Sequence, residues 1–193
     1  MSRLKHFLIA VALTFSAIGV VPQAIAQGTT IITIDEGKII RDSKAGKDIQ
    51  TKLSAIETQI NGELQPTAAS LEAEMNTLNT KLEGKTRQQV AADAALMGEI
   101  TAYDKKATDF AQKRARVSQE FANAERQAFI DFNTALEPVL MEVVREKNAQ
   151  VVMSRRAVIY SADAVDVSDL VISKLDAKTP TINVQRKPLP VQQ

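Results

Sequence analysis

Apolar and small residues recur at alternating steps of three and four along the middle of the chain. A spacing of this kind, kept over many turns, is typical of a helix that packs along a partner helix. Between about Gln88 and Asn148 the row, broken only by Arg114, consists of Leu96, Ile100, Tyr103, Ala107, Phe110, Arg114, Val117, Phe121, Ala124 and Ala128. A matching upstream row consists of Ile49, Leu53, Ile56, Ile60, Leu64, Ala68, Leu71, Met75, Leu78 and Leu82. Together the rows predict a long antiparallel helical hairpin over residues 43–148.

The start of the hairpin has signals of its own. Asp35 is the expected cap of a short helical turn before it, and Ser43 is the expected cap of the first arm. Gly46 falls in the first turn of that arm, which suggests close backbone packing or a break there.

The segment between the two rows, Glu83 to Arg87, has the composition of a turn. It contains Gly84 and no large apolar residue. A glycine among polar residues is typical of a short helix–helix connection. We therefore expect the tip of the hairpin near residues 83–88.

The upstream row changes its spacing to four-four-three between Ile60 and Leu71, which is a stutter that locally unwinds a supercoil. Pro66 falls inside this stutter and removes a helical hydrogen bond, and Gly62 lies just before it. We expect an interruption, a kink or hinge, at Gly62 and Pro66. It is either tolerated without a function or lets the arm change the width of a cavity. Pro138 predicts a second break, in the downstream arm.

The flanks of the hairpin predict a small α/β body made of residues 27–42 and 149–177. Thr29 to Ile34 is rich in β-branched residues and reads as a strand. Residues 149–153 and 157–160 predict two further strands joined as a hairpin, and Ser168 is the expected N-cap of a short helix. The predicted class is therefore α+β, a β-rich body with a projecting coiled-coil hairpin. A body of this size is marginal for a core of its own, which favours oligomerisation.

The two ends of the chain give separate expectations. Residues 1–26 have a basic start, an apolar run from Phe7 to Val21 and an Ala24-Ile25-Ala26 cleavage site, so they predict a cleaved signal peptide and export from the cytoplasm. The alternative is a membrane anchor, but the run is short for a spanning helix of about 20 residues. Residues 178–193 are rich in proline and polar residues, which predicts a disordered tail.

The composition of the chain excludes the commonest catalytic and metal-binding sites. The chain has no cysteine, and its single histidine, His6, lies in the predicted signal peptide. The usual nucleophile–base pairs and zinc ligands are therefore missing from the mature protein, and no glycine-rich phosphate loop is present. We expect no enzyme activity, cofactor or metal site. Removing Arg3 and Lys5 leaves 22 basic residues, from 24, against 23 acidic ones. This near-neutral balance argues against nucleic acid as the partner.

Several motifs resemble, in order, those of the Skp/OmpH family of periplasmic chaperones. They are the signal peptide, the strand that ends in Ile34-Asp35, the Ser-x-x-Gly-Lys junction at residues 43–47, the hairpin, and the closing block from Val151 to Val171. The resemblance extends to about Lys178. It implies a homotrimer whose strands join in a small barrel. Three hairpins would enclose a cavity that holds unfolded outer-membrane β-barrel proteins without ATP in the periplasm.

Two departures from the family pattern concern charge. Family members are often strongly basic, whereas the mature chain is close to neutral. Some members are credited with a lipopolysaccharide-binding cluster on the hairpin. The nearest equivalent here consists of Lys105, Lys106, Lys113, Arg114 and Arg116. A solvated charged face of the coiled coil is the favoured reading of these residues, and contact with anionic lipid or lipopolysaccharide is the alternative.

Apolar residues outside the seam are the candidates for contact with a client protein. Met97 and Phe129 each lie one position off the downstream row. A second class of function is also open, because a hairpin on a small body is also typical of a structural spacer or adaptor. Such a protein would bridge envelope components through residues 83–88. A spacer favours unbroken heptads, and the stutter around Pro66 argues against it.

Overall fold

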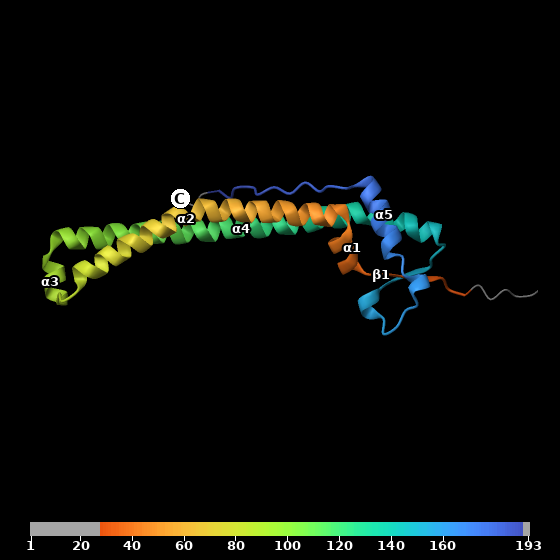
Figure 1. Cartoon of the computed structure of the whole chain (residues 1–193), viewed down its shortest axis with the longest axis horizontal. Helices are drawn as coiled ribbons and strands as arrows, with labels where there is room; N and C mark the ends of the chain where they lie inside the picture. The colour runs from red at the N-terminus through yellow and green to blue at the C-terminus, as the bar shows by residue number, and fades with distance from the viewer. Residues whose placement is uncertain (1–27, 191–193) are drawn as a thin grey trace, which may run out of the picture.

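Two long helices dominate the chain (Figure 1). α2 (Lys44–Leu82) and α4 (Ala94–Glu146) lie side by side and antiparallel, and the short helix α3 (Arg87–Ala92) joins them at the far end. The structure is a computed structural model that describes residues 28–190. The predicted signal peptide, residues 1–26, lies outside these residues. The helical hairpin confirms the predicted α+β class, and the turn between α2 and α3 lies where the sequence places the tip.

The remaining elements gather at the opposite end of the hairpin and form the body. They are β1 (Ile31–Ile34), α1 (Glu36–Asp42), β2 (Val151–Ser154), the 3-10 turns η1 (Arg155–Ala157) and η2 (Asp163–Val165), and α5 (Ser168–Lys178). β1 and β2 pair in parallel, with Ile31 opposite Val151 and Ile34 opposite Ser154. The two flanks of the hairpin are thus brought together by one short ladder.

The core runs from the body into the near part of the hairpin. Its fully buried side chains come from α1, α4 and α5 and include Ile39, Phe132, Val139, Val143, Val171 and Leu175. Further out, the predicted rows form the seam between α2 and α4, and every member of the α4 row is buried or half-buried except Arg114. The α2 row is less regular, because Ala68 and Met75 are exposed.

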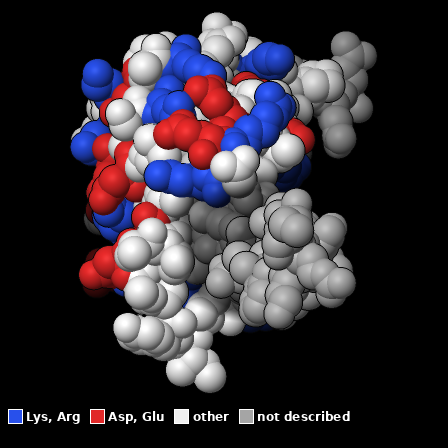
Figure 2. Space-filling view, turned by 90° about the vertical axis from the view of Figure 1, so that its right-hand side faces the viewer, with Lys and Arg blue, Asp and Glu red and all other residues white. Residues whose placement is uncertain are grey.

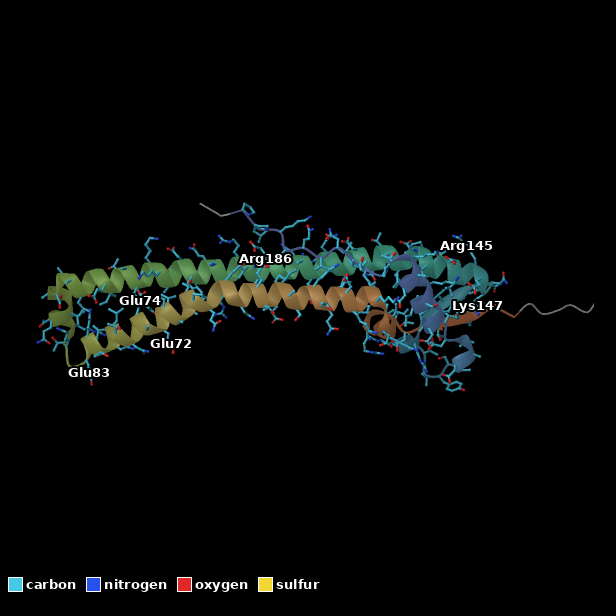
Figure 3. The ribbon with its side chains drawn as sticks, turned by 45° about the horizontal axis from the view of Figure 1, so that its top comes forward. Glu72, Glu74, Glu83, Arg145, Lys147 and Arg186 are labelled. Carbon is cyan, nitrogen blue, oxygen red and sulfur yellow. The ribbon has the colours of Figure 1, made fainter. Side chains whose placement is uncertain are left out.

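Both prolines lie inside continuous helices. α2 continues through Pro66 and α4 through Pro138, so the predicted break at Pro138 is wrong, and the kink or hinge predicted at Gly62 and Pro66 does not end its helix. A proline removes one hydrogen bond and can bend a helix without ending it where the flanking turns stay packed. The seam is nevertheless altered here, because residues 65–70 are all exposed. In Figure 3 the yellow part of α2 slants away from α4.

The sequence predicted the starts of α1 and α2 correctly. Asp35 caps α1, its carboxylate accepting a hydrogen bond of 2.9 Å from the amide of Lys38. Ser43 caps α2, its hydroxyl accepting one of 3.1 Å from the amide of Gly46. Gly46 was expected to mark either a break or close backbone packing, and the structure shows close packing against Ile40.

Two predictions in the body are wrong. Residues 157–160 form no strand, since β2 pairs with β1, and Ile159 and Tyr160 are strongly exposed. The expected hairpin turn has no Asn or Gly to adopt positive φ, and Ser154 instead caps the turn η1. Ser168 is the first residue of α5 and not its N-cap, which is Val167. Its hydroxyl accepts a hydrogen bond from the amide of Asp35 at 2.8 Å and so ties α5 to the end of β1.

The predicted disorder of the tail is wrong for residues 179–190. This segment is extended and follows the hairpin from α5 toward the tip (Figures 1 and 3). Alternate residues face the helices, with Ile182 buried and Val184 and Arg186 half-buried. This alternation of buried and exposed residues is the pattern of an extended chain that packs on one side. The sequence did not reveal it because the segment is rich in proline and polar residues.

We expect the substitution Gly46→Ala to lower the free energy of unfolding by about 2–3 kcal/mol. The added Cβ would lie 1.7 Å from the carbonyl oxygen of Ile40, so α1 and α2 would have to move apart. Gly98→Ala is the control, because no atom lies within 4 Å of its added Cβ and alanine is the better helix former. Urea unfolding measures both. Equal destabilisation by the two substitutions would contradict the packing argument.

The contact between α4 and α5 should depend on pH through Glu142. Hydrogen bonds from Lys174 and Lys178 hold the pKa of the Glu142 carboxyl at about 2, below its usual 4.5. A carboxylate with a lowered pKa stabilises the fold above its unfolded pKa and loses that contribution as the pH falls. We expect the unfolding free energy of the wild type to fall more steeply between about pH 4.5 and pH 2 than that of E142Q. Parallel curves from urea unfolding at each pH would contradict this assignment.

Candidate functional site

A furrow lies between α2 and α4 beyond Pro66, and we call it the distal furrow. It contains two shallow hollows, one of about 240 Å³ nearer Pro66 and one of about 390 Å³ nearer the tip. Both hollows are lined by Ser70 and Glu74 of α2 and by Lys106 of α4. Glu74 is labelled in Figure 3, where α2 slants away from α4. The hollows are therefore parts of one surface.

The rim of the distal furrow is held by ion pairs. Lys106 donates to both carboxylate oxygens of Glu74, at 3.0 and 2.9 Å, and nearer the tip Lys81 pairs with Glu99 at 2.6 Å. The hydrogen bond from Lys106 lowers the pKa of the Glu74 carboxyl. These side chains are largely solvated, so each pair contributes at most about 1 kcal/mol. The rim can therefore rearrange at little cost.

The floor of the distal furrow is apolar. Leu71 and Phe110 lie under the smaller hollow, and Leu78 and Tyr103 under the larger one. The two leucines are buried, and the two aromatic side chains are half-buried. These are members of the seam rows, so the sequence predicted them as hairpin core. Because the small or exposed residues of 65–70 leave the seam open, part of their surface lies in the hollows.

The two predicted client-contact residues are exposed, Met97 by 41% and Phe129 by 36%. They lie on opposite halves of α4, so the structure does not bring them into one site. Sequence reasoning missed three other exposed apolar side chains of the hairpin, Met75, Ile130 and Met141. Ile130 and Met141 lie off the row and could have been found in the same way as Met97. Met75 lies on the row, and only the parting of the helices exposes it.

The predicted basic cluster is largely paired. Lys105 donates to Asp109 at 2.8 Å, which raises the pKa of that lysine, and Lys106 binds Glu74. Lys113 donates to the carbonyl oxygen of Glu63 at 3.3 Å, and Arg116 lies 3.9 Å from the carboxylate of Glu120. Arg114 is exposed on the seam side. The structure therefore spreads these side chains among acidic partners and does not gather them around one free anion site.

The predicted hinge residues lie beside the start of the distal furrow. Open space surrounds Gly62, so its lack of a side chain is not required by packing. Pro66 lies one turn further along α2 at the start of the exposed stretch 65–70. Glu63, between them, binds Arg186 of the tail at 2.9 Å. The tail therefore reaches α2 next to the place where the helices part.

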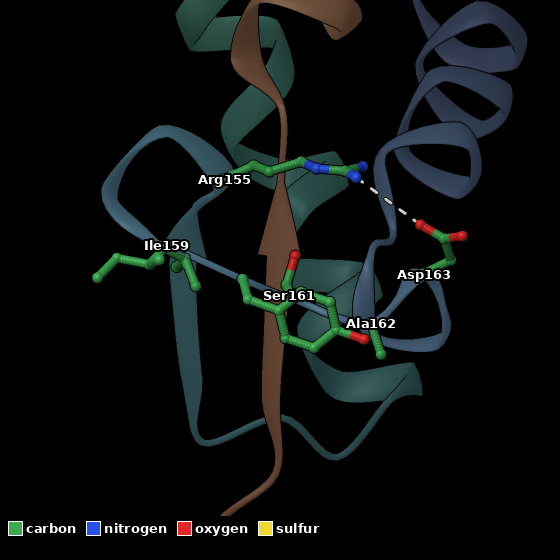
Figure 4. Close-up of a pocket in the computed structure, with 7 residues that line it drawn as sticks. Arg155, Ile159, Ser161, Ala162 and Asp163 are labelled. Atoms are coloured by element: carbon green, nitrogen blue, oxygen red, sulfur yellow. Dashed lines mark ion pairs between the residues drawn. The ribbon is translucent and has the colours of Figure 1, made fainter.

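A third hollow, of about 340 Å³, lies in the body and is formed by the loop that follows β2 (Figure 4). Arg155 crosses its edge and lies 3.7 Å from Asp163, with a second partner, Asp166, at 2.5 Å. Ile159 and Tyr160 line the hollow and are exposed. Figure 2 shows the body end, where charges of both signs intermingle in the upper part and mostly uncharged residues form the lower left edge. One loop supplies the whole lining, so this is a weak candidate for a ligand site.

Residues 28–190 lack two further kinds of site. No group of acidic, histidine or cysteine side chains there could hold a metal ion. Within the same range, none of the helices is both long and apolar enough to cross a membrane.

Comparison with known proteins assigns the chain to a family. The model of the family described as "Outer membrane protein (OmpH-like)" matches residues 30–175. Among solved structures, the chain is similar to the crystal structure of a candidate outer membrane chaperone (OmpH-like) from Caulobacter crescentus. The TM-score is 0.72 at 23% sequence identity, and the match covers 85% of this chain and 94% of that chain. At this identity the likeness shows the fold. Among curated proteins there is no match.

We expect the double variant K105A/R114A to bind anionic lipid vesicles with less than about twofold loss of affinity. A basic side chain that contacts an anionic surface contributes roughly 1 kcal/mol, so two such contacts would cost more than tenfold. R126A/K147A is the control, since it removes the same charge elsewhere on α4 and just after it. Vesicle co-sedimentation measures all three proteins. A tenfold loss confined to K105A/R114A would restore the lipid site.

Proposed function

Because the chain belongs to the OmpH-like family of outer membrane proteins, we propose that it is an ATP-independent holdase chaperone. It would bind unfolded outer-membrane β-barrel proteins in the periplasm and prevent their aggregation. The observation that carries this proposal is the distal furrow, with its apolar floor and its exposed rim of ion pairs. The membership confirms the resemblance seen in the sequence.

The shape of the distal furrow fits a loosely held, unfolded chain better than a small ligand. Small-molecule sites bury most of their ligand and are enclosed, whereas these hollows are shallow and open along the helices. An unfolded segment can lay one apolar side chain in each hollow, while solvated pairs such as Glu74–Lys106 shift around it. Such a site has many weak contacts and involves no covalent chemistry.

The proposed assembly is a homotrimer joined through the bodies. Within the described residues the sheet has only the strands β1 and β2. A bridge between Thr33 and Asp166 covers part of the outer edge of β1, whereas the outer edge of β2 is ready to pair with another chain. Exposed apolar side chains gather in this region, namely Ile31, Val151, Ile159 and Tyr160. Residues 157–160, predicted as a strand, lie next to these edges in sequence. Three bodies that share such edges would arrange three hairpins around one cavity.

Gly62 and Pro66 serve this function as a hinge. The seam is open over residues 65–70, and the contacts beyond it are solvated ion pairs and a few leucines. Weak contacts on the far side of a proline allow the outer part of α2 to move relative to α4. The width of the cavity would then adjust to clients of different size.

A spacer that bridges envelope components through the tip is the second candidate. One observation favours it, namely the reciprocal capping box in which Thr86 and Gln89 order the start of α3. Residues 83–89 are exposed, so a folded partner could reach them. This reading predicts a tight complex with one folded protein at the tip.

The test is dilution of a urea-unfolded outer-membrane β-barrel protein into the protein lacking residues 1–26, followed by size exclusion with light scattering. A trimer that keeps one client soluble without nucleotide supports the holdase. A monomer or dimer beside an aggregated client would refute it. A pull-down of a folded envelope partner would then test the spacer.

The substitution Ala102→Glu should weaken client binding by about threefold or more. Ala102 lines the larger hollow and is exposed, so a new carboxylate there needs no change in the fold but opposes an apolar side chain. Ala115→Glu is the matched control, being the same change at an exposed position of α4 outside both hollows. Equal client affinity of the two variants, by suppression of light scattering, would remove the distal furrow as the site.

A further inference from the structure

The tail segment 179–190 lies along the hairpin as an extended strap. It leaves α5 and runs from the body toward the tip, in the same direction as α2 (Figures 1 and 3). Its first anchor is Ile182, of which only 5% is exposed. The amide of Ile182 donates to the carboxylate of Asp48 at 2.9 Å, and its carbonyl oxygen accepts from Lys52 at 2.6 Å. Each backbone polar group of Ile182 is therefore bound by a side chain of α2.

The second anchor is Arg186, which touches both arms of the hairpin. Its guanidinium donates from Nη2 to both oxygens of Glu63 on α2, at 3.0 and 2.9 Å. Its Nε lies 3.2 Å from Oε2 of Glu120 on α4. The other oxygen of Glu120 accepts a hydrogen bond of 2.9 Å from the amide of Leu189. The tail thus supplies both main partners of a carboxylate on α4.

With the tail bound, Glu120 is buried and these partners replace its water. Only 3% of the residue is exposed, and a carboxylate removed from water is costly unless a cation and hydrogen-bond donors replace the water. Within the hairpin the nearest cation is Arg116, at 3.9 Å. Glu63 adds a second negative charge on the facing helix. Arg186 of the tail is therefore the cation that pairs with both carboxylates.

We propose that the groove formed by Asp48, Lys52, Glu63 and Glu120 is a binding site for extended peptide segments that combine alternating apolar residues with an arginine. We call it the strap groove. The tail is its ligand within the chain, and unfolded client segments compete with the tail for it. This inference rests on the proposed holdase function. It adds to that function the class of segment recognised and a means of occluding the site.

The ligand class follows from how the tail is held. The buried and half-buried positions Ile182, Val184 and Arg186 alternate with exposed ones, so the groove contacts every second side chain of the tail. Strands of outer-membrane barrels alternate apolar and polar residues with the same period. The strap groove makes few backbone contacts, at residues 182 and 189, so it can accept many sequences with this spacing.

The tail is also a ligand that can be exchanged. Nη1 of Arg186 is buried and has no partner among the described residues, so its clamp is incomplete. A tethered segment competes with an effective concentration in the millimolar range, even when its own contacts are modest. Replacing the arginine in the tail should therefore open the groove to a peptide added in solution.

The first experiment uses a fluorescent peptide with the sequence of residues 179–193 and the full mature chain as wild type, R186A or K187A. Lys187 is the matched control, since it is the neighbouring basic residue and is exposed. We expect R186A to bind the peptide at least about tenfold more tightly than wild type and K187A do. A peptide that itself carries R186A should not bind. Equal anisotropy titrations of the three proteins would overturn the proposal.

Two further variants guard this result. If circular dichroism shows that R186A is unfolded, I182S releases the other anchor and should give the same gain. The double variant R186A/E63Q should lose the gain, because the arginine of the peptide then finds one carboxylate fewer. A gain that survives in R186A/E63Q would show that the peptide binds elsewhere and would also overturn the proposal.

The second experiment separates the inference from the proposed function. The same proteins are tested for suppression of aggregation of an unfolded outer-membrane β-barrel protein, with and without the unlabelled peptide. We expect R186A to act at about threefold lower concentration than K187A, and the peptide to abolish that advantage. If all three proteins protect the client equally and the peptide has no effect, the holdase stands and the competing strap is wrong. If none of the proteins protects the client, the proposed function is wrong, and the strap groove is then tested by the anisotropy titration alone.

Discussion

The seam between α2 and α4 buries only a narrow stripe of each helix, so most of the hairpin surface faces water. Two helices alone gain little from such a stripe, and the apolar core of the protein lies instead at the body end. There Phe132, Val139 and Val143 of α4 meet side chains from α1 and α5. Away from this anchor the seam relies on single buried apolar residues and on ion pairs between solvated side chains. The far end of the hairpin is therefore held less firmly than the near end, and this gradient separates a rigid body from a compliant arm.

The tail changes this balance at one place. By joining Glu63 to Glu120 through Arg186, it adds a third partner to a two-helix structure at the point where the stripe of apolar contacts thins. With the tail in place the carboxylate of Glu120 is buried, and Arg186 and the amide of Leu189 offset the cost of that burial. The same residue thus connects the stability of the arm with the occupancy of the groove.

Local features of the sequence predicted local structure well. The rows of apolar residues located the seam, and Asp35, Ser43 and Gly46 located the starts of α1 and α2, because caps and close helix contacts act over three or four residues. Features that depend on distant partners were missed. Residues 157–160 have strand composition, but β2 takes β1 as its neighbour. Ser168 looks like a cap and instead binds Asp35. The sequence of the tail predicts disorder because the carboxylates that bind Arg186 lie far away in the sequence, one on α2 and one on α4. No local pattern in the tail indicates them. The distal furrow was likewise hidden, since its floor consists of the same residues that the pattern assigns to the core.

The parallel pairing of β1 with β2 has a consequence for the order in which the chain can fold. The hydrogen bond between Asp35 and Ser168 spans 133 residues, whereas the contacts near the tip join residues such as Lys81 and Glu99 that are close in sequence. The entropy cost of loop closure favours contacts between residues close in sequence, so the hairpin can form from its tip before β1 pairs with β2. The body is complete only after nearly all of the chain has emerged. A polypeptide cut short before α5 would keep its arms but leave the end of β1 unsealed, and would itself resemble the unfinished proteins that we propose it protects.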